Sequence, residues 1–268
     1  MAGGLSLGQE GTPGLSWFAI ARIGMVQASI GAIVMLTTSL LNRVMVVEYA
    51  LAAAIPAGLV AWHYGVQLAR PLWGQVSDQG RRRTPWILAG MAILAAGALL
   101  AVNATVMIGS NRGLAIGLMV LAFTLIGGGV GAGGTSALAL LASGVAPGRR
   151  AAAAAVTWIM MVAGIVVSAI VAGAMLKPYS PERLVIVASG VAIAALIVTV
   201  VATFRLEHGH QKFEETAKSE PPPDFRTAIA EIFQETAARR FTIFIFVSML
   251  AYSMQDLILE PFAGIVFG

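Results

Sequence analysis

Long apolar stretches, separated by short polar connections, dominate this chain. Seven of them are long enough for a membrane-spanning helix and predict spans at 17–41, 49–73, 85–108, 113–142, 151–176, 184–204 and 241–267. A bilayer core requires about 20 apolar residues in a helix, whereas barrel strands would be shorter and would alternate apolar with polar positions. The pattern therefore predicts an all-α polytopic membrane protein.

The spacing of these spans divides the chain into parts. Residues 1–16 are a predicted cytoplasmic tail, and 17–204 hold six spans with short connections. A polar segment, 205–240, precedes the seventh span, 241–268. Its stretch "DFRTAIAEIFQET" predicts an amphipathic helix, lying either at the membrane surface or in a solvated linker. This organisation is typical of a major facilitator-type six-helix bundle followed by the first helix of a second bundle.

Composition and charge agree with this assignment. The chain is 58% hydrophobic and 11% charged, whereas a soluble domain carries about a quarter charged residues. Thirteen of its 17 Lys and Arg residues fall on one side of the predicted membrane, which places the N-terminus in the cytoplasm. Because the basic residues follow membrane topology, the expected partner is the lipid bilayer and not a nucleic acid.

The sequence offers little for catalysis or metal binding. It has no cysteine and three histidines, and "EHGH" at 207–210 is too sparse to predict a metal site. No Walker sequence or Ser–His–Asp set is present, so no enzyme is expected. The glycine-rich stretch "GGGVGAGGTS", residues 127–136, lacks the Lys-Ser/Thr ending of a phosphate loop. Its small residues instead predict close packing between helices.

The turn after the second span, "WGQVSDQGRRRTPWIL", combines an acid with three arginines. A helix can approach Gly74 closely. Asp78 can accept hydrogen bonds from a helix N-terminus, and Arg82 and Arg83 can anchor the turn at an anionic membrane surface. The spacing resembles the major facilitator signature, from which Gln79 and Arg81 depart. The resemblance implies a cytoplasmic latch for one access state; alternatively, the arginines only determine topology.

Four charged residues lie near the ends of predicted spans: Arg43, Glu48, Asp256 and Glu260. Charges within a membrane are usually paired or functional. Asp256 and Glu260 are four residues apart and share a helix face, so Arg43 is a candidate partner for either if the first and seventh spans meet. Alternatively, the acids face water in the headgroup layer, or an unpaired carboxylate couples to protons.

Three further stretches narrow the family. "LNRVMVVE", "GRRRTPW" and "QDLILEPF" resemble the PucC/LhaA, or bacteriochlorophyll-delivery, family of the major facilitator superfamily, and the resemblance covers 40–87 and 254–268. It implies an assembly factor for light-harvesting antenna complexes in the bacterial inner (intracytoplasmic photosynthetic) membrane. The implied partners are antenna polypeptides and bacteriochlorophyll or its synthesis enzymes. Family members normally have a second bundle, so the chain is expected to be part of a longer protein.

Two hypotheses about function remain open at this point. In the first, the chain assembles antenna complexes and handles bacteriochlorophyll. In the second, it is a proton- or cation-coupled solute transporter. His63, in the middle of the second span, bears on the first hypothesis, because a neutral imidazole can be the axial ligand of a chlorophyll magnesium. The alternative is a packed histidine that is bonded to a backbone carbonyl or to Tyr64.

Overall fold

The computed structural model describes residues 14–79, 82–207, 227, 230, 233–248 and 251, without the side chains of residues 76, 78 and 79. The chain divides into two compact units, Met1–Ser219 and Glu220–Gly268. In the second unit, residues 236–248 are helical and their large apolar side chains are exposed. This helix contains the start of the predicted seventh span, whose remainder lies largely outside the described residues.

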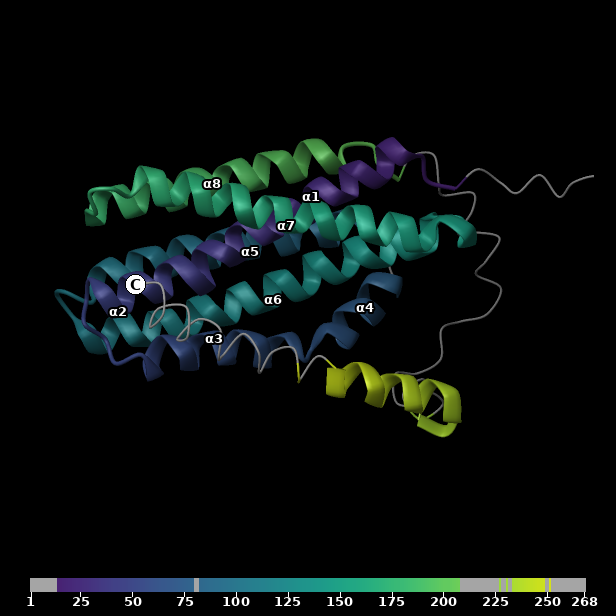
Figure 1. Ribbon diagram of the computed structural model, residues 1–268, viewed down its shortest axis with the longest axis horizontal. Coiled ribbons are helices and arrows are strands. Elements are labelled where there is room, and N and C mark those ends of the chain that lie inside the picture. The colour runs from purple at the N-terminus through teal and green to yellow at the C-terminus, as the bar shows by residue number, and fades with distance from the viewer. Residues whose placement is uncertain are drawn as a thin grey trace, which may run out of the picture. The chain divides into compact units, whose positions relative to one another are not determined.

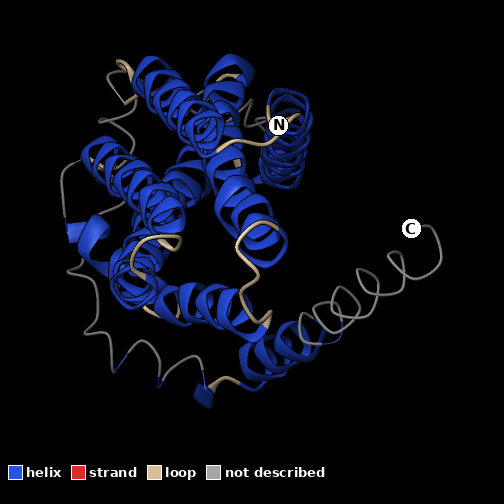
Figure 2. Ribbon diagram, turned by 90° about the vertical axis from the view of Figure 1, so that its left-hand side faces the viewer, coloured by secondary structure: helices blue, strands red, loops and turns tan. Residues whose placement is uncertain are grey.

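The described part of the first unit consists of helices and the turns that join them (Figures 1 and 2). The elements in chain order are α1 (Trp17–Met35), the π-helix η1 (Leu36–Leu40), α2 (Leu41–Val47), α3 (Ala54–Gln67), α4 (Arg70–Gln79), α5 (Thr84–Met107), α6 (Arg112–Gly144), the 3₁₀-helix η2 (Pro147–Arg149), α7 (Arg150–Met175) and α8 (Pro181–Thr203).

Five described helical stretches are long and apolar enough to cross a membrane: Trp17–Val47, Thr84–Met107, Arg112–Gly144, Pro147–Met175 and Pro181–Thr203. They correspond to the first, third, fourth, fifth and sixth predicted spans. The prediction of an all-α polytopic membrane protein is confirmed. The first span continues beyond Leu41 to Val47, because α1, η1 and α2 are continuous.

The prediction of one continuous second span at 49–73 is wrong. The chain forms the 14-residue helix α3, a break at Leu68 and Ala69, and then α4, and the break is visible in Figure 1. At the break, the N–H groups of Leu68 and Ala69 donate to carbonyls three residues back, at Gly65 and Val66. The cause is Pro71, which has no N–H and whose ring would clash with the carbonyl four residues earlier in a regular helix.

The glycine-rich stretch of α6 packs closely against α5. A Cβ built on Gly129 would lie 2.5 Å from the backbone nitrogen of Leu94, and one built on Gly90 would lie 2.3 Å from the nitrogen of Gly133. Backbone atoms cannot move aside as a side chain can. The prediction of close packing through small residues is therefore confirmed, and these glycines set the distance between the two helices.

The same stretch of α6 also faces α3 and α4. A Cβ on Gly127 would lie 2.7 Å from the carbonyl oxygen of His63, and one on Gly131 would lie 3.1 Å from the Trp73 ring. Since residues 127 and 131 lie on a different face from 129 and 133, α6 contacts the α5 helix with one face and the broken second span with another.

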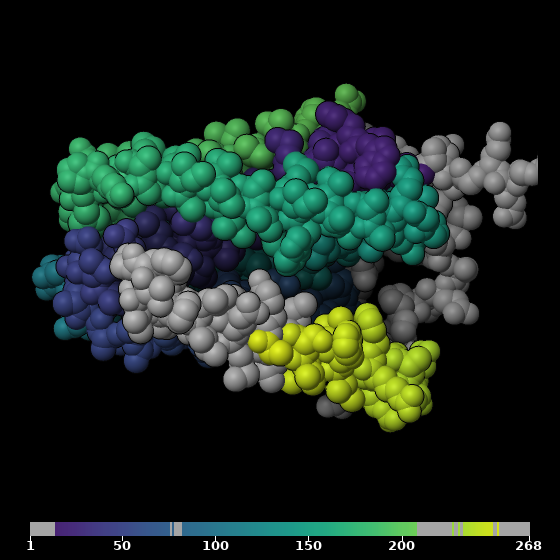
Figure 3. Space-filling view, in the orientation of Figure 1, coloured from purple at the N-terminus to yellow at the C-terminus, as the bar shows by residue number. Residues whose placement is uncertain are grey.

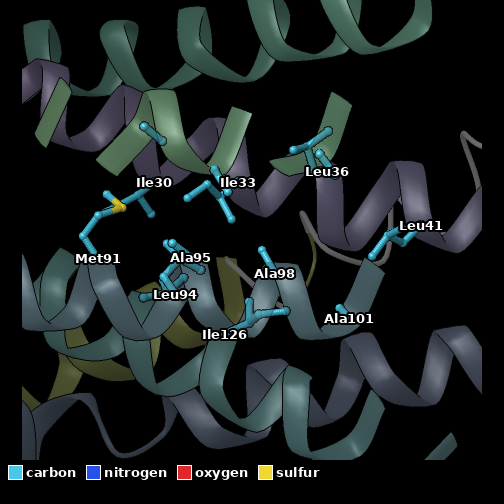
Figure 4. Close-up of a cluster of buried hydrophobic side chains, with 14 of the residues drawn as sticks. Ile30, Ile33, Leu36, Leu41, Met91, Leu94, Ala95, Ala98, Ala101 and Ile126 are labelled. Carbon is cyan, nitrogen blue, oxygen red and sulfur yellow. The ribbon is translucent and has the colours of Figure 1, made fainter. Parts of the chain in front are cut away.

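A second close pair is formed by α1 and α7. A Cβ on Gly31 would lie 2.8 Å from the carbonyl oxygen of Met161, and the Ser168 hydroxyl donates to the carbonyl of Ala32 at 3.1 Å. The helix α8 packs against both α1 and α5. Figure 4 shows where α1, η1 and α2 meet α5 and α6 in a cluster of buried apolar side chains that includes Ile33, Leu36, Leu94 and Ile126.

The outer surface of the bundle is apolar along α7. This helix forms a long ridge on the face shown in Figure 3, and its exposed large side chains include Trp158, Ile159, Val167, Ile170 and Met175. A soluble protein rarely exposes an apolar surface of this extent. The surface fits a helix that faces lipid or another membrane helix.

We expect Gly129→Ala to destabilise the bundle and its neighbour Gly128→Ala to leave it intact. The methyl group at 129 meets backbone atoms of α5, whereas a Cβ at 128 has nothing within 4 Å. Overpacking of this kind costs about 1–3 kcal/mol, while alanine in an open helical position is neutral or mildly favourable. Thermal unfolding of both variants in detergent measures the difference. Equal midpoints would contradict the packing assigned to Gly129.

Candidate functional site

The arginine-rich turn lies at the end of the bundle where α5 begins and α6 ends. Arg82 is exposed, and the half-buried Arg83 donates from Nη1 to the hydroxyl of Ser143 at 3.1 Å. Gly74 lies beside Thr135 of α6, where a Cβ would make an ordinary contact at 3.6 Å. Close approach at this point therefore does not require a glycine. The side chain of Asp78 is outside the described part, so its role as a helix cap stays a prediction.

The N-terminus of α5 is capped by Glu207, from the turn that follows α8. One carboxylate oxygen accepts the backbone N–H of Arg83 at 2.7 Å, and the other accepts that of Thr84 at 3.1 Å. The first N–H groups of a helix lack partners within the helix and carry a partial positive charge. The carboxylate satisfies two of them and joins the end of α8 to the start of α5.

Arginines and aromatic rings occupy the same end of the bundle at α1 and α7. The guanidinium of Arg149 lies 4.6 Å from the centre of the Trp17 ring, a cation–π distance. Arg22 donates from Nε to the carbonyl of Ala202 at 2.8 Å and from Nη2 to that of Phe204. Arg22 thereby satisfies carbonyls at the C-terminus of α8. The arginines at this end thus connect helix termini.

A chain of polar side chains lies at the break between α3 and α4. Arg70 donates from Nη2 to Oε1 of Gln67, and the amide nitrogen of Gln67 lies 2.6 Å from Nε2 of His63. The three residues are spaced four and three apart, so they share one side of the helix. His63 is only 1% exposed, and it meets the Tyr64 ring edge-on at 5.0 Å between ring centres.

The hydrogen bonds of this chain determine the tautomer of His63. A guanidinium has donors but no acceptor, so it must face the oxygen of the Gln67 amide. The amide nitrogen then points at His63 and can only donate, which makes Nε2 the acceptor. The ring is therefore neutral with its proton on Nδ1. That Nδ1–H is buried and has no partner among the described residues.

This arrangement bears on the pigment-ligand prediction for His63. The Nε2 lone pair is already engaged by Gln67, and Nδ1 carries the proton. A magnesium ion would bind Nε2 only after the Gln67 side chain moved away. The partner of the imidazole is thus Gln67, and neither a backbone carbonyl nor the Tyr64 hydroxyl. Ligation of a pigment by His63 stays a prediction.

At the opposite end of the bundle, Arg43 and Glu48 are both exposed, and neither makes an ion pair with another residue of the described ranges. Their proposed partners Asp256 and Glu260 lie outside those ranges. Nearby, the Tyr179 hydroxyl donates to that of Tyr49 at 3.5 Å. Burial and this hydrogen bond raise the pKa of Tyr179, and the charge of Glu48 adds to the rise. The tyrosines join the turn between α7 and α8 to the end of α2.

The roles of three residues at these sites are not predicted from the sequence. Glu207 has no local signal, because the N–H groups that it caps lie more than 120 residues earlier in the chain. Gln67 and Arg70 do have one, since with His63 they form an i, i+4, i+7 polar series inside an apolar stretch. The series is overlooked when Arg70 is grouped with the basic residues outside the membrane, because only His63 and Gln67 then remain as polar residues within the span.

We expect Glu207→Ala to free the start of α5. Loss of a capping carboxylate costs about 0.5–2 kcal/mol, and amide hydrogen exchange at Arg83 and Thr84 should become faster. The matched control is Glu235→Ala, a change at an exposed glutamate in the second unit. Hydrogen-exchange mass spectrometry of both variants checks the cap. Unchanged exchange at Arg83 and Thr84 in Glu207→Ala would show that the carboxylate does not hold α5.

The sequence of the chain is similar to those of several known proteins. The chain is 50% identical over 254 residues to the "Bacteriochlorophyll synthase 44.5 kDa chain" of Rhodobacter capsulatus, an alignment that covers 95% of this chain and 59% of that protein. It is 28% identical to "Protein PucC" of Rhodobacter capsulatus and 29% identical to "Protein PucC" of Cereibacter sphaeroides; each alignment covers 91% of this chain and 56% of the relative.

The chain therefore spans somewhat more than half the length of these relatives. The PUCC protein family matches residues 40–268, which include α3, α4 and the arginine-rich turn. A match over this much of the chain shows its family. This multi-pass membrane protein belongs to the PUCC family.

Proposed function

We propose that this protein is a membrane assembly factor for bacterial light-harvesting antenna complexes and that it handles or delivers bacteriochlorophyll. The observation that carries the proposal is the PUCC family match over residues 40–268. The relative at 50% identity supports the pigment part, because its name contains bacteriochlorophyll. The solute-transporter hypothesis gains no comparable support from these relatives.

The proposed partners follow from the chemistry of the surface. The apolar ridge of α7, with Trp158 and Ile170 exposed, suits lipid or a membrane helix of an antenna polypeptide, since van der Waals packing between side chains contributes to helix association in lipid. We place the protein in the inner, intracytoplasmic photosynthetic membrane. The excess of Lys and Arg on one side favours a cytoplasmic N-terminus.

We propose further that the chain itself is not an enzyme. The word "synthase" in the name of one relative belongs to that protein, and the sequence of this chain lacks a recognisable catalytic set. A role beside the enzymes of pigment synthesis accommodates both facts. Purified protein should then bind pigment without converting it, and new pigment products in the purified preparation would overturn this part of the proposal.

The direct test of the proposed function is purification from a pigment-making host in mild detergent. We expect bacteriochlorophyll absorption bands and antenna polypeptides, identified by mass spectrometry, to co-purify with the chain. A colourless preparation without antenna polypeptides would contradict the proposed function.

Two variants decide the part played by His63. If Nε2 binds the pigment magnesium, His63→Ala should lose most of the pigment, whereas Gln67→Leu, which releases the Nε2 lone pair, should retain it or bind more. If His63 only packs the helix, both variants break the same polar chain and should lower the pigment content alike. Full retention of pigment in His63→Ala would exclude His63 as the ligand.

A further inference from the structure

The start of α1 lies directly beside the start of α7. The backbone N–H of Leu15 donates to the carbonyl of Gly144, shortly before α7, at 2.8 Å. Trp17 lies seven residues before Gly24, and a Cβ on Gly24 would collide with the side chain of Met160 in α7. Trp17 is therefore on the face of α1 that meets α7. Figure 3 shows the purple start of α1 beside the teal start of α7.

Arg149 is held over the ring of Trp17. Its guanidinium lies 4.6 Å from the ring centre, a contact that attracts the cation without neutralising its charge. Nε and Nη2 of Arg149 are buried, and no described residue accepts a hydrogen bond from them. Nη1 is thus the nitrogen that an outside group can reach. The exposed Arg150 donates from Nε to the carbonyl of Val145 at 3.1 Å, which fixes a second guanidinium at the start of α7.

This cluster lies at the depth of phospholipid headgroups. Trp17 and Arg149 are at the start of two stretches that are long and apolar enough to cross a membrane, Trp17–Val47 and Pro147–Met175. The hydrocarbon core begins near the ends of such stretches, and the headgroup region lies just outside it. A half-exposed tryptophan at this level is typical of the membrane–water interface. A lipid phosphate is therefore expected at the same depth as the Arg149 guanidinium.

An apolar surface extends from the cluster towards the centre of the membrane. Beyond Arg150, every exposed residue of α7 is apolar or a glycine. Phe18 of α1 is 75% exposed, and the exposed Met25 lies on the same face of α1, two turns further along. A basic cluster next to a continuous apolar surface matches the two parts of an anionic phospholipid, its headgroup and its acyl chains. A soluble anion would gain nothing from the apolar part.

We propose that Arg149 and Arg150 bind the headgroup phosphate of an anionic phospholipid, whose acyl chains lie along the exposed side of α7. Guanidinium groups form charge-assisted hydrogen bonds with phosphate oxygens. Trp17 is a positioning residue, which holds the Arg149 guanidinium at the headgroup level. A zwitterionic lipid carries the same phosphate, but its ammonium group would approach two arginines, so an anionic headgroup is favoured. The site does not depend on the proposed function, because no pigment takes part.

The test compares phosphatidylglycerol with phosphatidylcholine on the full chain in detergent, with bound lipid measured by native mass spectrometry. We expect the wild-type chain to bind phosphatidylglycerol about 10-fold more tightly, as a charge-assisted hydrogen bond allows. Arg149→Gln should lose most of this preference. The matched control is Arg82→Gln, the same change of charge at an exposed arginine of the same end of the bundle, which should keep the preference.

A second measurement locates the lipid. Bromine on the acyl chains quenches tryptophan fluorescence only at short range, so brominated phosphatidylglycerol reports which tryptophans lie near it. Trp17→Phe keeps an aromatic ring for Arg149 and should keep the lipid preference, but part of the saturable quenching should disappear. Quenching equal to that of the wild-type chain would place the lipid away from Trp17 and overturn the site.

The remaining outcomes are equally decisive. Arg150→Gln changes an exposed side chain, so it should fold normally and still lower the preference for phosphatidylglycerol; an unchanged preference in both Arg149→Gln and Arg150→Gln would overturn the site. Equal losses in Arg149→Gln and Arg82→Gln would show a diffuse attraction to basic residues and no defined site. Displacement of the lipid by inorganic phosphate at equal concentration would mean that the ligand is a soluble anion.

Discussion

The close contact of α6 with its neighbours is the constraint on which the rest of the structure depends. Its glycines let the backbone of α5 approach on one face and that of α3 on another, at distances that leave no room for a Cβ, and Gly131 makes room for the Trp73 ring of α4. In lipid, where apolar surface gains little from burial between helices, such backbone contact is a main source of helix association. It also fixes the depth of the α3–α4 break, and with it the position of Arg70.

At the arginine-rich end of the bundle, side chains join the ends of helices. Glu207 joins α8 to α5, and Arg22 joins α1 to the last carbonyls of α8. These contacts satisfy backbone groups that would otherwise be exposed where the helices end. The predicted latch and the observed cap thus use the same chemistry, a carboxylate at a helix N-terminus, and the described residue that supplies it to α5 is Glu207.

Much of the fold follows from apolar length alone, which is why five spans were predicted correctly. The break in the second span is not predicted by apolar length, because residues 49–73 are long and apolar enough for one continuous helix. The residue that indicates the break in the sequence is Pro71. The packing role of residues 127–136 could be read from their size. The Glu207 cap could not, because it depends on the tertiary pairing of α8 with α5. The His63–Gln67–Arg70 chain was present as a helical spacing, but its meaning depends on the depth of Arg70, which only the packing on α6 reveals.

The depth of the break between α3 and α4 can be measured directly, and we expect the break to lie within the membrane. The chain has no cysteine, so a single cysteine at Leu68 or at Arg82 can carry a nitroxide in reconstituted bilayers. The accessibility of each label to oxygen and to a water-soluble nickel complex reports its depth. The label at 68 should lie on the order of 10 Å deeper than the label at 82. Equal exposure of both labels to the nickel complex would place the break, and Arg70 with it, outside the membrane.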